Sequence, residues 1–329
     1  MVNKNLGHNN SDYPLVSVNV VTYNSSATIV ETLESIKAQS YPRIELIVSD
    51  DCSEDNTLAI CQKWIDLNKS NFENAVIITS PFNTGISKNC NRALNTANGD
   101  WIKPIAGDDT LKSSSIKKYI EFINKHPEAA LIYSNMDHYI NEFRSENKMP
   151  SRPNQKENAL YFSKLPIKYQ IEVLARIVII GAPSIFFNRQ KVCNAGGFNE
   201  ISRYMEDLPS YYTWLEHGLK FYYLNESTVN YRLHQNSISN KKDSEQMSFS
   251  NQPLRVESVI RQLCYPHYSK IEKLFYNIEM AFFHFYIKKT PKSYFGLGLR
   301  KLWYTLTVKS VSIRRKSIKR YYMKYMKEN

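Results

Sequence analysis

The sequence lacks long hydrophobic runs, paired cysteine motifs and, near its C-terminus, acidic residues. Its longest apolar run, residues 177–187, is too short to cross a bilayer. Its 5 cysteines are widely spaced and none forms Cys-x-x-Cys, which argues against a disulfide framework or a zinc site and suits a reducing compartment. Residues 1–11 are polar, so no secretory leader is expected. These absences predict a cytoplasmic protein that touches a membrane only peripherally.

Positive charge is concentrated at the C-terminal end of the chain. Residues 281–329 hold 13 Lys and Arg against one acid, Glu328, whereas the first 280 residues carry 30 of each sign. The formal net charge of +12 therefore belongs to this last segment. A neutral body with a cationic end predicts a negatively charged partner, either an anionic lipid surface or nucleic acid phosphates.

What the sequence does contain is an alternation of strand and helix patterns. Short β-branched runs predict strands at residues 16–21, 44–48, 76–79 and 130–133. Apolar residues at helical spacing predict helices at residues 27–39, 57–67, 86–96 and 113–124. Residues 141–158 are polar and contain proline, which predicts a mobile loop, and residues 171–180 fit either helix or strand. The alternation is typical of an α/β fold with a parallel sheet.

Three polar clusters follow strands in this pattern. Two are Thr22–Tyr23 and Asp50–Asp51, and the third ends the apolar run of residues 99–109 with the adjacent carboxylates Asp108 and Asp109. Ligands of open parallel sheets bind beyond the carboxyl ends of the strands, where all three clusters are expected. Mg²⁺ and Mn²⁺ take one or two carboxylates plus substrate phosphates, so the third cluster is a candidate cation site. The alternative is a solvated β-turn.

Four ordered segments resemble the nucleotide-sugar-binding half of family 2 glycosyltransferases with the GT-A fold: residues 16–24, 45–57, 83–91 and 101–109. The resemblance implies an α/β enzyme whose Rossmann-like half has a mixed sheet. It divides the chain into a nucleotide-sugar-binding half, an acceptor half and a helical, basic, aromatic-rich C-terminal region, at residues 1–110, 111–240 and 241–329.

In this family the first loop and the acidic end of the second strand hold the nucleotide. The resemblance places Thr22 and Tyr23 against the base and Asp51 on the base edge. An aromatic face can stack on a nucleobase, although a surface turn is the alternative for Tyr23 and a helix cap the alternative for Asp50. Arg232 could pair with phosphate. The whole set expected to bind nucleotide is Thr22, Tyr23, Asn24, Asp50, Asp51, Asn83, Asn91, Asp108 and Arg232.

The family's metal-binding acidic motif corresponds to Asp108–Asp109. The resemblance makes Asp109 the direct ligand of Mn²⁺ or Mg²⁺ and gives Asp108 a contact to ribose or to a metal-bound water. His234 could complete the metal shell, the alternative being a hydrogen-bonded loop residue. This chain has Ala106 at the first acidic place of the commoner motif, so its affinity for the metal should be weaker.

A second carboxylate pair, Glu206–Asp207, follows Gly196-Gly197-Phe198 and opens a predicted helix. Acids in the first turn of a helix are stabilised by its dipole, so simple capping is one interpretation. The other comes from the resemblance to the family's acceptor-side motif, in which the Asp is the catalytic base. Asp207 would then remove the acceptor proton in an inverting transfer while Glu206 orients the acceptor.

The C-terminal region combines aromatic and basic residues. Trp303 and Tyr304 lie in a predicted helical segment, residues 297–322, that also contains Arg314, Arg315 and Lys316. Such a composition favours the headgroup layer of an anionic membrane, while a solvated basic helix packed on the body is the alternative. Nucleic acid is the less favoured partner.

Together these features predict an inverting, metal-dependent hexosyltransferase. It would move a hexose from a nucleotide-diphosphate sugar, with UDP favoured, to a saccharide acceptor that is lipid-linked, in surface polysaccharide or O-antigen synthesis at the inner membrane surface. One alternative is a nucleotidyltransferase, although no glycine-rich phosphate loop lies near the N-terminus. The other is a non-enzymatic nucleic-acid-binding protein that uses the basic tail.

Overall fold

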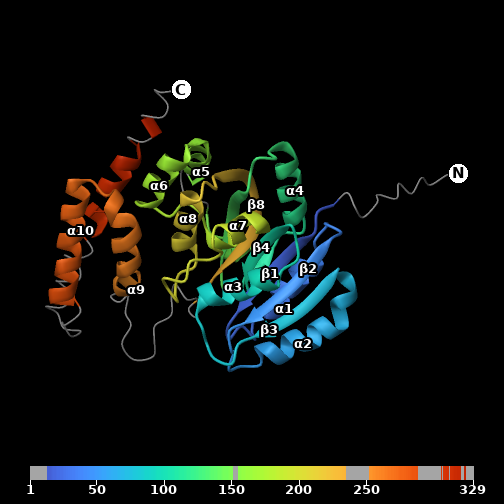
Figure 1. The fold of residues 1–329 in the computed structure, drawn as a ribbon. Coiled ribbons are helices and arrows are strands. Elements are labelled where there is room, and N and C mark those ends of the chain that lie inside the picture. The colour runs from blue at the N-terminus through green and yellow to red at the C-terminus, as the bar shows by residue number, and fades with distance from the viewer. Residues whose placement is uncertain are drawn as a thin grey trace.

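The computed structural model describes residues 13–150, 155–234 and 252–287 and, near the C-terminus, residues 305, 307–310, 312–319 and 322–323. Eight strands form one sheet in the order β3-β2-β1-β4-β7-β6-β8-β5. Helices flank this sheet, and α9 and α10 stand away from it at one edge of the molecule (Figure 1). The expected α/β architecture is confirmed.

The N-terminal part of the sheet is parallel. Its strands are β1 (Val16–Thr22), β2 (Ile44–Asp50), β3 (Asn74–Thr79) and β4 (Trp101–Ala106). β1 and β2 are buried almost throughout, as expected for Val- and Ile-rich parallel strands covered on both faces. The intervening helical segments are α1 (Ile29–Lys37), α2 (Thr57–Asn68), η2 (Lys69–Asn71) and α3 (Ile86–Thr96).

The remaining strands make the sheet mixed. They are β5 (Thr110–Leu111), β6 (Leu131–Ile140), β7 (Ile185–Asn188) and β8 (Phe221–Leu233). β7 runs antiparallel to both β4 and β6, β8 runs parallel to β6, and β5 runs antiparallel to β8. The helical segments here are α4 (Ser115–Lys125), η3 (Ser145–Asn147), α6 (Ile167–Leu174), η4 (Ala182–Ser184), α7 (Arg189–Asn194) and α8 (Asp207–Glu216).

The predicted loop at residues 141–158 needs correction at its end, because α5 (Gln155–Lys164) begins inside it. Residues 151–154 lie outside the described part of the chain. Tertiary packing overrides the polar composition here: Ala159 and Phe162 are buried in the core, and the Tyr133 hydroxyl donates to the Ala159 carbonyl at 2.5 Å. The undecided segment 171–180 is helical only as far as the end of α6 at Leu174.

The C-terminal region is helical where it is described. It contains α9 (Gln252–Val259), η5 (Ile260–Cys264), η6 (Tyr265–His267), α10 (Lys270–Phe282) and η7 (Phe283–Ile287). A capping box starts α10, since Ser269 accepts from the Glu272 amide and Glu272 accepts from the Ser269 amide. Part of the helix predicted at residues 297–322, including Trp303 and Tyr304, lies outside the described residues.

Two hydrophobic clusters cover the two faces of the sheet. One includes β1 and helices α1, α2 and α4, and the other joins α3, α6 and α8 to residues of α9 and α10. The predicted boundaries at residues 110 and 240 stay predictions, since one sheet runs from β1 to β8. No helix among the described residues has the length and hydropathy needed to cross a membrane.

Candidate active site

The register of the parallel strands brings the predicted polar clusters to one edge of the sheet. Thr22 lies opposite Asp50 on β2, and Val21 lies opposite Ala106 on β4. The amide of Gly107 continues this pairing by donating to the Val21 carbonyl at 3.0 Å. The expectation that the three clusters share the carboxyl edge of the sheet is therefore confirmed.

The acidic end of β2 is saturated with hydrogen bonds from the protein itself. Asp50 accepts from the Ser53 amide at 2.8 Å and from the Ser53 hydroxyl at 2.5 Å. Asp51 accepts from the Thr84 amide and hydroxyl, from the Gly85 amide at 2.7 Å and from Arg92 at 3.2 Å. Both side chains are buried. Asp50 thus closes its own turn, and Asp51 holds the loop before α3.

The loop after β1 is fixed by its neighbours. Thr22 is buried, and its hydroxyl has no hydrogen-bond partner among the described residues. Asn24 takes the left-handed conformation, with φ of 53°, and its side chain accepts from the Glu54 amide at 2.8 Å. Tyr23 is half-buried between them. Of the three predicted nucleotide ligands in this loop, Thr22 has an unused polar atom, whereas the Asn24 side-chain oxygen is already occupied.

Asn83 and Asn91 act as braces around α3. The Arg203 guanidinium donates to the Asn83 side chain at 2.9 Å, and the Asn91 amide donates to the Phe198 carbonyl and to Glu200 at 2.8 Å each. Asn91 also accepts from the Phe198 amide, so both ends of its side chain are used. These bonds tie α3 to the segment before α8.

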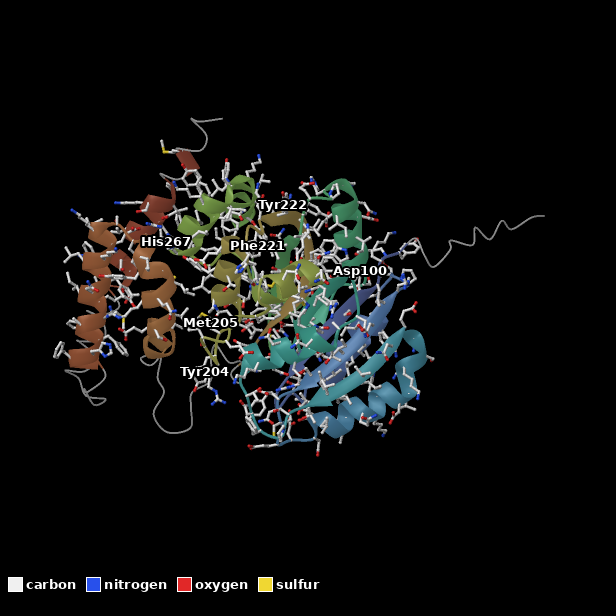
Figure 2. The ribbon with its side chains drawn as sticks, in the orientation of Figure 1. Asp100, Tyr204, Met205, Phe221, Tyr222 and His267 are labelled. Carbon is white, nitrogen blue, oxygen red and sulfur yellow. The ribbon has the colours of Figure 1, made fainter. Side chains whose placement is uncertain are left out.

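Gly85 allows the same two segments to approach closely. Its φ is +92°, and the Cβ of Arg203 lies 2.6 Å from where a Gly85 side chain would begin. Figure 2 shows Tyr204 and Met205 from this segment lying beside α3. A larger residue at position 85 would push apart the loop that Asp51 holds and the segment that carries Glu206 and Asp207.

The pair Asp108–Asp109 is divided between the interior and the surface. Asp109 is 0% exposed, its Oδ1 accepts from the Arg232 amide at 2.8 Å, and its Oδ2 is buried without a hydrogen-bond partner among the described residues. Burial and the neighbouring Asp108 charge raise the pKa of Asp109. Asp108 keeps a partly exposed side chain, 2.9 Å from Nε2 of His234. The accessible carboxylate of this pair is therefore that of Asp108.

Arg232 holds the turn that carries Asp108 and Asp109. Its guanidinium donates to the backbone carbonyls of Asp108 and Asn141 and to the Glu31 carboxylate, and it lies 4.1 Å from the centre of the Phe143 ring. The residue is only 5% exposed. This arrangement gives Arg232 the role of orienting the acidic turn and leaves the predicted phosphate contact without support.

Asp108 and His234 fit a divalent cation. A carboxylate oxygen and an imidazole nitrogen 2.9 Å apart at a partly exposed sheet edge could bind one Mn²⁺ or Mg²⁺ together. The described residues contain no group of three His, Cys, Asp or Glu side chains placed to hold a metal. A cation here would therefore need further oxygens from a ligand such as a diphosphate.

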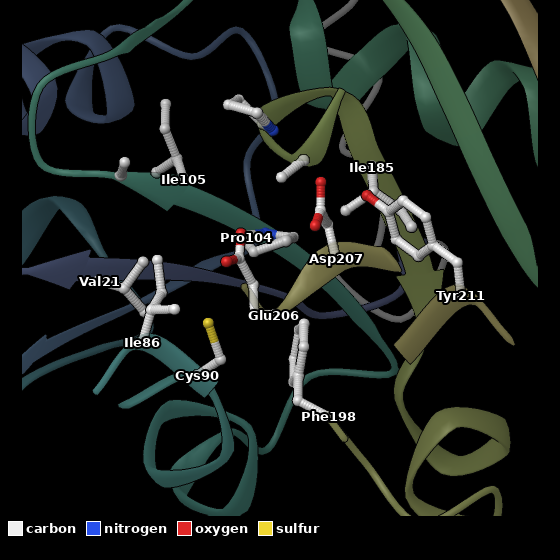
Figure 3. Close-up of a pocket in the computed structure, with 13 residues that line it drawn as sticks. Val21, Ile86, Cys90, Pro104, Ile105, Ile185, Phe198, Glu206, Asp207 and Tyr211 are labelled. Atoms are coloured by element: carbon white, nitrogen blue, oxygen red, sulfur yellow. The ribbon is translucent and has the colours of Figure 1, made fainter. Parts of the chain in front are cut away.

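Glu206 and Asp207 lie in a pocket at the end of β4. The pocket is also lined by Val21, Ile86, Cys90, Pro104, Ile105, Ala106, Ala182, Pro183, Ile185, Phe198 and Tyr211. Both carboxylates point into it, with Val21, Ile86 and Cys90 on one side and Tyr211 on the other (Figure 3). Because Ala106 comes two residues before Asp108, the pocket lies next to the candidate cation site. The turn that carries Asp108 and Asp109 thus follows the strand end that forms one wall of the pocket around Glu206 and Asp207.

The surroundings of these two acids disfavour their charged forms. Burial and the charge of Asp207 raise the pKa of Glu206 to about 8, and burial raises the pKa of Asp207. Asp207 accepts from the amide of Leu208 at 2.7 Å, whereas Glu206 makes no side-chain capping bond. A carboxylate with a raised pKa and few hydrogen bonds is a good proton acceptor. A residue that only caps a helix does not need a raised pKa.

Two residues of the site were not predicted from the sequence. Tyr211 is 1% exposed, its hydroxyl has no partner among the described residues, and Figure 3 shows that hydroxyl turned toward the side where Asp207 lies. Lys103, within β4, is fully buried and donates to the carbonyls of Pro183 at 2.5 Å and Ile185 at 3.2 Å, which fixes one pocket wall. The only sequence signal for Lys103 was a cation inside an apolar strand.

Comparisons with known proteins agree with this geometry. The profile of the family described as "Glycosyl transferase family 2" matches residues 17–196. TuaG of Bacillus subtilis (strain 168), provisionally named a teichuronic acid biosynthesis glycosyltransferase, is 28% identical over 229 residues, which cover 70% of this chain and 83% of TuaG. The Escherichia coli UDP-Glc:alpha-D-GlcNAc-diphosphoundecaprenol beta-1,3-glucosyltransferase WfaP is 27% identical over 258 residues, covering 78% of this chain and 92% of WfaP.

A solved structure shares the fold. The crystal structure of residues 1–349 of Staphylococcus aureus TarS in complex with UDP-GlcNAc superposes with a TM-score of 0.55 at 20% identity, over 75% of this chain and 65% of that chain.

Proposed function

The chain belongs to glycosyl transferase family 2 and has the GT-A fold, and from this premise we propose that it transfers a hexose from a UDP-sugar to a saccharide acceptor with inversion at the anomeric carbon. Family membership makes it a glycosyltransferase, so the nucleotidyltransferase and the nucleic-acid-binding alternatives have no support. The observation that carries the proposal is the pocket at the end of β4 that contains Glu206 and Asp207, with Ala106 in its wall two residues before Asp108.

A uridine nucleotide and a lipid-linked acceptor are supported by the relatives. The name of WfaP specifies UDP-glucose and an undecaprenol-linked acceptor, and the TarS complex contains UDP-GlcNAc. We assign this chain to the same broad process, bacterial surface polysaccharide synthesis at the cytoplasmic face of the membrane, reached through its basic C-terminal region.

In the proposed reaction Asp207 is the base. Its carboxylate would take the proton of the acceptor hydroxyl as that oxygen attacks the anomeric carbon from the face opposite the diphosphate. Its raised pKa strengthens it as a proton acceptor, and Glu206 would orient the acceptor beside it. The Tyr211 hydroxyl, which is buried and has no hydrogen-bond partner in the described part of the chain, would donate to a sugar oxygen in the filled pocket.

Asp108 and His234 would hold Mn²⁺ or Mg²⁺, with Asp109 and Arg232 keeping their turn in place. When bound, the cation would neutralise charge on the leaving diphosphate. This assignment transfers the role of direct ligand from Asp109 to Asp108, because the Asp109 carboxylate is fully buried. For the nucleotide, Thr22 and Tyr23 keep their proposed contacts, while Asp50, Asp51, Asn83 and Asn91 would shape the loops around it.

Thermal unfolding in the presence of nucleotides tests the donor. UDP and UDP-sugars with Mn²⁺ should raise the melting temperature, and nucleotides with other bases should raise it less, because a ligand stabilises the folded state according to its affinity. A turnover assay with a diphosphate-lipid saccharide then tests the transfer. The absence of any response to uridine nucleotides would refute the donor assignment.

A further inference from the structure

Helix α10 has apolar side chains on two faces. Its inner face is buried and includes Tyr276, Met280 and the carboxylate of Glu272, which pairs with Arg176. Its outer face carries four large apolar residues whose exposed fractions are 54%, 56%, 43% and 70%, namely Ile271, Leu274, Ile278 and Phe285 in the following turn. We call these four residues the α10 stripe. Ile271, Leu274 and Ile278, spaced by three and four residues, lie along one side of α10 over about 10 Å, and Phe285 follows in the π-helical turn η7.

The exposed surface of α10 carries no negative charge. Its two acids, Glu272 and Glu279, are buried at 2% and 8% exposure, while Lys270 is exposed and Lys273 is half-buried. Among the described residues that follow, Lys309, Arg315, Lys316 and Lys319 are exposed. An apolar stripe beside cations, with every acid of the helix turned inward, is the pattern of a helix that lies in the interface of an anionic bilayer.

From these observations we propose that the α10 stripe is the surface by which this protein inserts into an anionic membrane. A second copy of the chain is a poor partner for this face, because each copy has a net charge of +12 with the excess in the same C-terminal segment. An anionic lipid surface matches both the cations and the exposed apolar side chains of this face. Figure 1 shows α10 at the outer edge of the molecule, where a planar surface can reach it.

A buried ion pair joins α10 to the rest of the protein. Arg176, which follows α6, donates to both carboxylate oxygens of Glu272 at 2.9 Å, and its Nη2 also donates to the His267 carbonyl. A membrane bound at α10 would therefore hold the catalytic cleft at a fixed height and tilt. This part of the inference deepens the proposed lipid-linked acceptor and rests on that proposed function, whereas membrane insertion itself does not.

Flotation of the full-length protein with lipid vesicles tests the inference. The wild-type protein should float with vesicles of phosphatidylcholine and phosphatidylglycerol in equal parts and float poorly with phosphatidylcholine alone. The double variant Leu274→Ser/Ile278→Ser should bind the anionic vesicles at least about tenfold more weakly. The reason is that burying one large aliphatic side chain raises the partition coefficient by about a factor of ten or more. The control Leu67→Ser, at a 74% exposed apolar residue of α2, should bind like the wild type.

A second readout separates insertion from simple attraction of charges. A Leu274→Trp variant should show a blue shift of its emission, and quenching by brominated lipids, only with anionic vesicles. Equal flotation of the double variant and the wild type would overturn the inference and leave the basic tail as the sole contact. A change in the sedimentation of the lipid-free double variant would also overturn it, by making the stripe a contact between protein copies.

Thermal unfolding with UDP and Mn²⁺ distinguishes this inference from the proposed function. All these variants lie outside the cleft, so their response to nucleotide should match that of the wild type. Loss of vesicle binding with an intact nucleotide response supports the stripe. A missing nucleotide response in the wild type counts against the proposed function alone.

Discussion

The two acidic pairs, Asp108–Asp109 and Glu206–Asp207, differ in how the protein uses them. In Asp108–Asp109, one carboxylate is fully buried and bound to a backbone amide, and the other is partly exposed beside His234. In Glu206–Asp207 both side chains face the same pocket, and among the described residues they accept hydrogen bonds from nearby amides of their own segment.

This difference teaches that adjacency in sequence does not give two carboxylates the same task. Asp108 and Asp109 lie in the turn between β4 and β5, where the Asp109 side chain is turned into the fold and the Asp108 side chain stays partly exposed. At the start of α8, both Glu206 and Asp207 face the pocket. The pKa of each is raised because hydrogen bonds do not fully offset the cost of burying its charge. In the first pair Asp109 has a structural role and Asp108 is available for binding. In the second pair both carboxylates are placed to take part in proton transfer.

The largest expected effect is that of Asp207→Asn. Removing a general base lowers the rate typically by about 10² to 10⁴. We expect a loss of turnover of that size with UDP-sugar binding retained, measured by steady-state kinetics and thermal shift. Glu216→Gln, at an exposed position at the other end of α8, is the matched control and should keep the wild-type rate. An unchanged rate for Asp207→Asn would remove this residue from the role of base.

The next effect should separate Asp108 from Asp109. Asp108→Ala should abolish the additional stabilisation that Mn²⁺ gives to the UDP complex and leave the melting temperature of the ligand-free protein unchanged. Asp109→Ala should lower the free energy of unfolding by about 1–3 kcal/mol, because it leaves the buried Arg232 amide without an acceptor. Melting curves with and without UDP and Mn²⁺ measure both. The reverse result would restore Asp109 as the metal ligand.

The third effect concerns pH. Since the pKa of Glu206 is raised to about 8, the folded protein holds a proton that the unfolded chain releases near its ordinary pKa, so Glu206 lowers stability progressively as pH rises between these two values. Glu206→Gln should therefore raise the melting temperature at about pH 9 by a few degrees and leave it unchanged at about pH 4. Melting curves at these two pH values measure the difference between the variant and the wild type.

The smallest effect compares neighbouring tyrosines of α8. Tyr211→Phe removes a hydroxyl that has no partner within the described ranges, so stability should stay constant while kcat/KM falls about tenfold through the lost bond to sugar. Tyr212→Phe removes a hydroxyl that donates to the Ile171 carbonyl at 3.3 Å, so it should change stability slightly and leave kcat/KM unchanged. Equal kinetics for both variants would show that Tyr211 does not touch substrate.

The parts that the sequence predicted correctly are those set by local pattern. Hydrophobic periodicity located the strands that end at Thr22 and Asp50, and register then brought their polar ends together. Hydrophobic periodicity could not reveal which polar side-chain atoms the protein leaves available to a ligand. Asp51 and Asn91 have the residue types of nucleotide ligands, yet distant segments occupy them through Arg92 and Phe198. In the sequence Tyr211 looks like any aromatic residue of a buried helix. What distinguishes it in the structure is that its hydroxyl has no hydrogen-bond partner among the residues described.

The buried Arg176–Glu272 pair has a consequence for how such proteins can be altered. Both side chains are almost inaccessible, at 1% and 0% exposure, and one comes from the transferase body and the other from α10. A stop codon or protease cut before α10 would remove Glu272 and leave Arg176 with Glu172 of α6, at 2.9 Å, as its remaining ion-pair partner. Exchanging C-terminal regions between relatives should therefore preserve more stability where the new region brings its own acid for this arginine.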